Sequence, residues 1–232
     1  MKVRIRFSKS GALVYIGHLD VMRYFQKLFR RAGIPVAYSE GFSPHQILSF
    51  TPPLPLGMES NGEYADVELT QSVKSDEAIK ALIEQSVPEI VIHSFKELPE
   101  KSENAMASVK AAAYRVNFID RDKVPDLEAA VSSFIDKKTV NAVKKTKKSE
   151  RTIDLKPLVY ELSADNSEGY VDMLISSGST DNIKPELVLS SLLDDAQDPS
   201  KKRFDVLIKR IDQYTLSDGK LVSLDDIGKI IK

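Results

Sequence analysis

Two kinds of hydrophobic repeat follow one another along this chain, and their order limits the possible folds more than any other feature. Residues 3–7, VRIRF, alternate apolar and charged side chains, which is typical of a half-buried strand. Residues 18–32 instead place apolar side chains three and four positions apart, which indicates a helix that ends at Gly33 and Pro35. The other elements predicted in the first half are strands at 47–50, 63–69 and 90–95 and a helix at 75–82. The order strand, helix, strand, strand, helix, strand predicts the split βαβ, or ferredoxin-like, arrangement.

The same order of elements occurs again in the second half of the chain. The predicted strands are 113–118, 139–143, 170–175 and 204–211, and the predicted helices are 125–135 and 185–193. We therefore predict an α+β protein with two tandem ferredoxin-like domains that have antiparallel sheets. The predicted parts are domain 1 at 1–98, a polar linker at 99–110, domain 2 at 111–216 and a C-terminal tail at 217–232. A short helix is predicted to start at Ser223 in this tail.

Missing residue types and motifs disfavour several classes of function. The chain has no cysteine, so it has no disulfide, no thiolate zinc site and no iron–sulfur cluster held by its own side chains. It also lacks the glycine-rich phosphate loop, the dinucleotide-binding motif and the nucleophile elbow, which disfavours NTPases, nucleotide dehydrogenases and serine hydrolases. No apolar run approaches the roughly 18 residues of a membrane span, and the N-terminus lacks the apolar core of a signal peptide. We therefore expect a cytoplasmic protein that does not associate with membranes.

Positive charge is concentrated in two segments, although the formal net charge of the chain is only −1. Residues 1–50 carry eight Lys and Arg against two acids, and residues 137–151 carry seven against one. On the helix predicted at 18–32, four cations lie roughly opposite the apolar stripe, namely Arg23, Lys27, Arg30 and Arg31. The second segment is predicted to be a hairpin arm with the cations Lys144, Lys145, Lys147, Lys148 and Arg151. Such segments favour binding to the phosphates of RNA, while solvated Lys faces without a partner are the alternative explanation.

The loop YSEGFSPHQ at residues 38–46 contains more chemically active side chains than a simple turn needs. If the loop meets the start of the helix predicted at 18–32, one end of domain 1 would bring together His18, Asp20, Glu40, Ser43 and His45. These residue types have more than one possible use.

Four interpretations of these side chains stay open. Imidazole and carboxylate groups would suit a divalent metal, or His18 and His45, with Asp20, would act as general acid and base on RNA without a metal. The structural interpretation is that these residues only cap a helix and shape a turn. In the fourth, exposed Tyr38 and Phe42 rings stack on RNA bases while the nearby cations hold phosphates.

The segment Arg4 to Leu69 resembles a known family. It contains the motifs F-S-K, G-H-L-D, R-R-A-G-I-P-V-A-Y-S-E-G-F-S-P-H, P-L-P-L-G and G-E-Y-A-D, and with them it looks like the radical-SAM-linked protein family, an uncharacterised domain. The resemblance implies a protein encoded beside, or fused to, a radical SAM enzyme, often in neighbourhoods concerned with ribosomes and RNA processing. It implies no activity, and it assigns no catalytic residue. Because this chain lacks the thiolates of a radical SAM cluster, that chemistry would belong to the partner.

The leading hypothesis is therefore an accessory protein that binds tRNA or rRNA and presents it to a radical SAM partner. The first alternative is a metal-independent RNA-processing or RNA-modifying enzyme that uses His18 and His45. The second is a scaffold for the radical SAM partner that binds no RNA. We expect no cofactor and no metal of the chain's own in any of the three.

Overall fold

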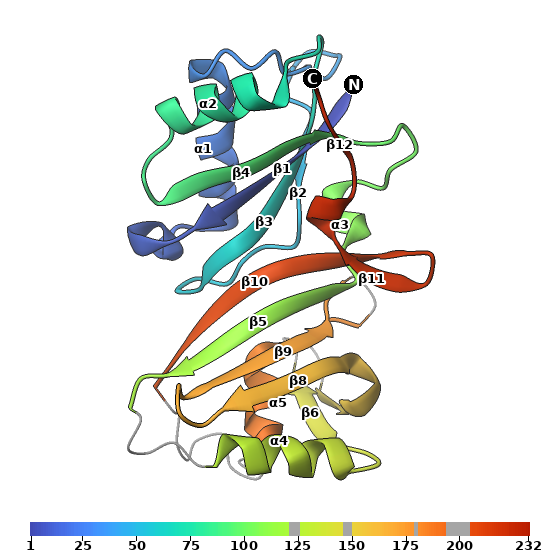
Figure 1. Cartoon of the computed structure of the whole chain (residues 1–232). Helices are drawn as coiled ribbons and strands as arrows, with labels where there is room; N and C mark the ends of the chain where they lie inside the picture. Colours follow the sequence, from blue (N-terminus) through green and yellow to red (C-terminus); the bar gives the residue numbers. More distant parts are fainter. Residues whose placement is uncertain (121–125, 146–149, 179–180, 194–204) are drawn as a thin grey trace. The chain divides into compact units, whose positions relative to one another are not determined.

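A computed structural model describes residues 1–120, 126–145, 150–178, 181–193 and 205–232. The chain forms two compact units, which are Met1–Lys110 with Arg210–Lys232 (unit 1) and Ala111–Lys209 (unit 2). Each unit combines helices with strands that are mostly antiparallel (Figure 1), which confirms the predicted α+β class. Residues 210–232 belong to unit 1, whereas the sequence analysis assigns them to domain 2 and the tail.

The elements of unit 1 follow the predicted order closely. They are β1 (Lys2–Lys9), a 3-10 turn η1 (Gly11–Tyr15), α1 (His18–Arg31), β2 (Leu48–Phe50), β3 (Glu59–Glu68), α2 (Ser75–Gln85), β4 (Ile90–Glu97) and α3 (Ala105–Ser108). The strand β10 (Val206–Ser217) enters unit 1 at Arg210 and continues to β11 (Lys220–Ser223), η5 (Leu224–Asp226) and β12 (Lys229–Ile230). The sheet of unit 1 has the order β12-β4-β1-β3-β10, with β2 also on β3 and β11 also on β10.

One face of this sheet packs on the helices and forms the apolar core of unit 1. Alternation places Val3, Ile5 and Phe7 of β1 on the buried side, and α1 buries Phe25 and Leu28 against them. Helices α1 and α2 lie on this face (Figure 1). The Phe7 and Phe25 rings are 4.5 Å apart between centroids, so the start of the chain holds α1 in place.

The opposite side of β1 is charged, and it is buried at Arg4 and partly buried at Arg6. Arg4 donates two hydrogen bonds to the Asp66 carboxylate of β3, at 2.7 and 2.9 Å, and a third to Ser108 of α3. Residues 99–110, predicted as a polar linker, thus contain a short helix that covers this side of the sheet. A buried charge pair with all its hydrogen bonds made is tolerated, whereas either partner alone would be strongly destabilising.

The C-terminal segment is held on unit 1 by polar contacts. The Asp225 side chain accepts a hydrogen bond from Ser94, and its backbone oxygen accepts one from the Lys96 ammonium at 2.6 Å. Ser223 caps the turn η5, where a short helix was predicted, by accepting a hydrogen bond from the Asp225 N–H at 3.1 Å. The last strand, β12, pairs with β4.

Unit 2 departs from the predicted order in its middle strands. Its elements are β5 (Ala111–Phe118), α4 (Leu127–Asp136), β6 (Asn141–Lys145), β7 (Glu150–Asp154), η3 (Lys156–Leu158), β8 (Val159–Asp165), β9 (Tyr170–Ser176) and α5 (Pro185–Leu192). The sheet order in unit 2 is β5-β9-β8, whereas β6 and β7 form a separate two-stranded sheet. Strand β8, which the sequence analysis does not predict, pairs with β9, whereas the strand predicted at 139–143 corresponds to β6 and pairs with β7. Leu162 and Ala164 of β8 pair with buried Met173 and Val171 and give β8 its apolar face.

Candidate functional site

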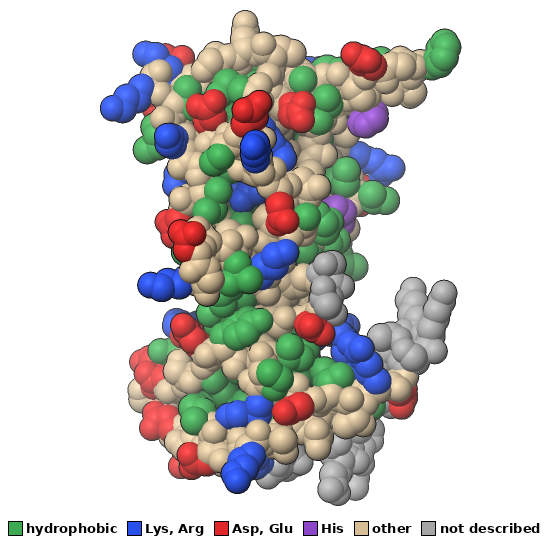
Figure 2. All heavy atoms as spheres, turned by 90° about the vertical axis from the view of Figure 1, so that its right-hand side faces the viewer, with side chains coloured by type: hydrophobic (Ala, Val, Ile, Leu, Met, Phe, Trp, Pro, Cys, Tyr) green, Lys and Arg blue, Asp and Glu red, His purple; other side chains and the backbone are tan. Residues whose placement is uncertain are grey.

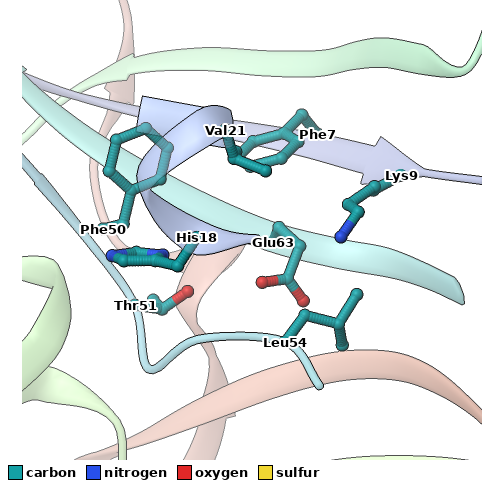
Figure 3. Close-up of a pocket in the computed structure, with 8 residues that line it drawn as sticks. All are labelled: Phe7, Lys9, His18, Val21, Phe50, Thr51, Leu54 and Glu63. Atoms are coloured by element: carbon teal, nitrogen blue, oxygen red, sulfur yellow. The ribbon is translucent and has the colours of Figure 1, made fainter. Parts of the chain in front are cut away.

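His18 lies at the first position of α1 and lines a small pocket in unit 1. The ring packs edge-on to Phe50, with 5.8 Å between centroids. Figure 3 shows the eight lining residues, which come from β1, α1, the β2 region and β3; they are Phe7, Lys9, His18, Val21, Phe50, Thr51, Leu54 and Glu63. The cavity of about 20 Å³ has room for about one water molecule, so it is too small to hold a nucleotide.

The charged side chains of this pocket are almost completely buried. Lys9 is 2% exposed, and its ammonium donates to the Ile16 carbonyl at 3.3 Å. Glu63, on the neighbouring strand (Figure 3), accepts from the Arg210 guanidinium at 2.9 and 3.2 Å. Burial lowers the pKa of the Lys9 ammonium, against the attraction of Glu63. Burial is also the main cause that lowers the pKa of His18, so its imidazole is neutral at pH about 7.

The loop at residues 38–46 closes on itself like a small hairpin. Tyr38 and Gln46 form an antiparallel bridge, and Ser39 N–H donates to the His45 carbonyl at 2.8 Å. The Ser39 hydroxyl accepts from the His45 N–H at 3.1 Å and lies 2.9 Å from its Nδ1. Gly41 gives the turn a φ of +106°, a backbone conformation that residues other than glycine rarely adopt.

This loop and the exposed face of α1 enclose an open groove of about 320 Å³. Its lining residues are Arg23, Gln26, Lys27, Arg30, Tyr38, Pro44, His45 and Gln46. The three cations are four and three positions apart on α1, which places them on one helix face. The Arg23 side chain binds Asp20 at 3.2 Å, whereas the side chains of Lys27 and Arg30 make no hydrogen bond or ion pair with any described residue. The groove therefore offers two cations that are not already neutralised.

The groove contains only part of the predicted RNA-binding set. Of the predicted residues on α1 and the loop, Arg31 and Phe42 do not line it. Arg31 instead donates to the Gln85 carbonyl at the end of α2, at 3.1 Å. Phe42 is fully exposed at the loop tip, where a ring is available for stacking.

The structure does not bring the two predicted catalytic histidines into one pocket. His18 lines the small pocket and His45 lines the groove, and Asp20 is engaged by Arg23. Within the described ranges, no group of three or more His, Cys, Asp or Glu side chains is arranged to hold a metal ion.

The predicted basic arm corresponds to the hairpin of β6 and β7. Lys144 is directly opposite Arg151 in the strand register, and Arg151 is exposed. Lys145 ends β6. Lys147 and Lys148 lie outside the described residues.

Several cations of the first segment are buried in unit 1 and add little charge to its surface. Arg4 is paired with Asp66, and Lys9 lies inside the pocket. On the face drawn in Figure 2, Lys and Arg side chains are mixed with Asp and Glu side chains. Local alternation placed Arg4 on the polar side of a strand, but no local signal indicated that a second layer covers that side.

The fold and the groove define an α+β protein whose site is suited to an anionic ligand. Residues 2–185 match the model of the family described as "Uncharacterized protein conserved in bacteria (DUF2344)", and the chain belongs to this family. That description names no activity and no partner, so the expected link to radical SAM enzymes stays a prediction. A search of curated proteins found no match to the chain. None of the described helices is long and apolar enough to cross a membrane.

Proposed function

We propose that this protein is a non-catalytic accessory protein that binds RNA in the groove between α1 and the loop at residues 38–46. The observation that supports the proposal is the pair of cations, Lys27 and Arg30, that have no partner among the described residues and line the same groove as Tyr38. Guanidinium and ammonium groups bind phosphate oxygens through charge-assisted hydrogen bonds. Phosphate binding of this kind supplies affinity for RNA without reading its sequence.

The aromatic residues of the loop favour an unpaired strand over a duplex. Tyr38 is 54% exposed and Phe42 is fully exposed, and exposed rings are the surfaces on which splayed bases stack. A duplex keeps its bases stacked on one another, so it would make no use of these rings. We take tRNA or rRNA loops as the substrate class.

The partner in this proposal is a radical SAM protein, and its basis is the resemblance of the segment Arg4 to Leu69 to the radical-SAM-linked family. The chain has no cysteine for a cluster, so the partner would perform the chemistry and this protein would present the RNA.

We also infer that each unit is a ferredoxin-like module. In unit 1 the order β4-β1-β3-β2, with each pair of neighbours antiparallel, supports this assignment. In unit 2 the antiparallel order β5-β9-β8 is compatible with it.

The test is RNA binding by a variant with Arg23, Lys27 and Arg30 all replaced by Ala. Loss of two phosphate contacts, or three if Arg23 leaves Asp20, is expected to weaken binding to a single-stranded RNA and to lower the slope of log affinity against log salt by about 1.4 to 2. Fluorescence anisotropy at several salt concentrations measures both quantities.

The matched control replaces three exposed lysines of unit 1 outside the groove, Lys80, Lys101 and Lys220, with Ala. It removes the same charge and is expected to keep most of the affinity. Equal losses in the two triple variants would show a general effect of charge and would contradict a site in the groove.

A further inference from the structure

The side-chain amide of Gln46, which lines the groove, has hydrogen-bond partners for its nitrogen but none for its oxygen among the described residues. Gln46 is only 8% exposed. Its Nε2 donates to the Gln26 backbone carbonyl at 3.2 Å and to the Tyr38 hydroxyl at 3.3 Å. Its Oε1 is buried and has no hydrogen-bond partner among the described residues. Buried side-chain acceptors nearly always have a partner, so this oxygen requires an explanation.

The neighbours of the amide determine which atom is the oxygen. A backbone carbonyl only accepts hydrogen bonds, so the atom facing the Gln26 carbonyl must be the nitrogen. The two N–H groups then go to Gln26 and Tyr38, and both donors of the amide are in use. What remains is one buried acceptor, on a residue that lines a groove to which Lys27 and Arg30 contribute donors.

The ligand that satisfies both parts of this groove carries an anion and a hydrogen-bond donor. Lys27 and Arg30 donate hydrogen bonds and therefore suit phosphate oxygens, which only accept hydrogen bonds. Oε1 accepts hydrogen bonds and therefore needs an N–H or O–H donor, which a simple polyanion does not have. A nucleotide has both, because its base carries N–H groups beside the sugar phosphate.

We propose that Gln46 is a specificity-determining residue whose Oε1 accepts a hydrogen bond from the exocyclic amine of an unpaired RNA base. This inference rests on the proposed RNA-binding function and adds base selection to it. Adenine, cytosine and guanine have such an amine, whereas uracil has a carbonyl oxygen in its place. With a carbonyl oxygen in the place of the cytosine amine, uracil bound in the same orientation would turn that oxygen toward the Gln46 oxygen, so we expect the groove to favour cytosine over uracil.

The side chain that would move to admit the base is Tyr38. Its hydroxyl bonds the Gln46 amide at 3.3 Å, and its ring is more than half exposed. The contact with the Gln26 carbonyl does not involve this ring, so it would hold the amide in its orientation if the ring moved.

The experiment compares oligo(C) and oligo(U) of equal length, since cytosine and uracil differ at the amine position and the adjacent ring nitrogen. We expect the native protein to bind oligo(C) roughly 3- to 10-fold more tightly at neutral pH and one salt concentration, as for one hydrogen bond to a base. In Gln46→Met, which keeps the length of the side chain and removes the acceptor, the ratio is expected to fall to about 1 with little change for oligo(U).

The control is Tyr38→Phe, which removes the hydroxyl beside Nε2 and leaves Oε1 and the ring. It is expected to keep the preference for oligo(C). Circular dichroism of both variants checks that they are folded, and Gln46→Asn, which retains a shorter amide, provides a second test of the acceptor if the Met variant unfolds.

The outcomes separate this inference from the function on which it rests. Equal affinity of the native protein for both oligomers, or a preference that persists in Gln46→Met, would overturn base selection by Gln46. Absence of binding to either oligomer, or binding that does not depend on Arg23, Lys27 and Arg30, would instead overturn the proposed function.

Discussion

Single residues of β1 show how strongly the surroundings change the role of a charged side chain. The side chains of Arg4 and Lys9 are polar in the sequence and buried in the structure. Arg6 is partly buried, with guanidinium nitrogens 3.8 Å from Asp212 and 3.7 Å from Asp225. These cations are engaged by acidic or carbonyl groups of unit 1, so the cations of the proposed RNA site are those on α1.

His18 predicts how the stability of the protein depends on pH. Burial lowers the pKa of its imidazole below the ordinary value of 6.5. At pH values between the lowered pKa of the folded protein and 6.5, the unfolded chain binds a proton that the folded protein does not, so acid favours unfolding. The contribution of His18 to stability is complete above pH about 6.5 and is lost as the pH falls through this window, with a slope of at most about 1.4 kcal/mol per pH unit.

Urea unfolding of the native protein and of His18→Gln at a series of pH values measures this effect. The variant is expected to lose less stability between pH about 7 and about 5 than the native protein does. An identical decline in the two proteins would mean that His18 is as accessible to protons in the folded state as in the unfolded chain.

At the scale of elements, β3 and β10 approach each other closely at a glycine. A Cβ atom on Gly62 would lie 2.7 Å from the Asp212 Cα and 2.8 Å from the Ile211 carbonyl oxygen. These are backbone atoms, which do not move aside as the end of a flexible side chain does. The approach also places the Gln213 amide within 2.8 Å of the Gly62 carbonyl, so the glycine joins β10 to the unit 1 sheet.

We therefore expect Gly62→Ala to destabilise the protein by about 3 kcal/mol or more through overpacking between two strands. The comparison is Gly33→Ala, where the φ of +66° is unfavourable for alanine but no atom lies within 4 Å of the added Cβ. That change is expected to cost about 1 kcal/mol. Chemical denaturation measures both values, and a larger loss for Gly33→Ala would contradict this account of the strand contact.

At the scale of the whole molecule, unit 1 is built from both ends of the chain. Residues 210–232 return to it after unit 2 has been completed. Arg210 from this segment donates a hydrogen bond to Glu63, and Asp212 accepts one from the Tyr64 hydroxyl. Asp225 accepts hydrogen bonds from Ser94 and Lys96. Unit 2 is continuous in sequence.

A chain that ends at residue 209 is therefore expected to lose order mainly in unit 1. Its Glu63 carboxylate and Tyr64 hydroxyl would lose their buried partners, and an uncompensated buried charge costs about 3–5 kcal/mol. Hydrogen exchange by residue is the measurement, and we expect faster exchange in β3 and β4 than in β8 and β9 of unit 2, which do not pair with the deleted residues. Uniform acceleration through both units would show that they unfold as one.

By itself, the sequence determined the α+β class, the approximate ranges of most helices and strands, and the cationic face of α1. These features depend on side-chain type and on hydrophobic period within one or two turns of chain, which can be read locally. It missed β8, because charged and polar residues interrupt the apolar alternation of that strand and it follows a basic segment with no clear boundary.

Only the tertiary structure decided which of those side chains are available for function. The Glu63 and Arg210 pair joins residues 147 positions apart, and the groove combines α1 with a loop that follows it. Local pattern does not encode such contacts, because burial and pairing depend on the elements that fold over a residue from elsewhere in the chain. For this reason Lys9 became an interior residue, and Gln46, the last residue of the loop, became a buried side chain that lines the groove.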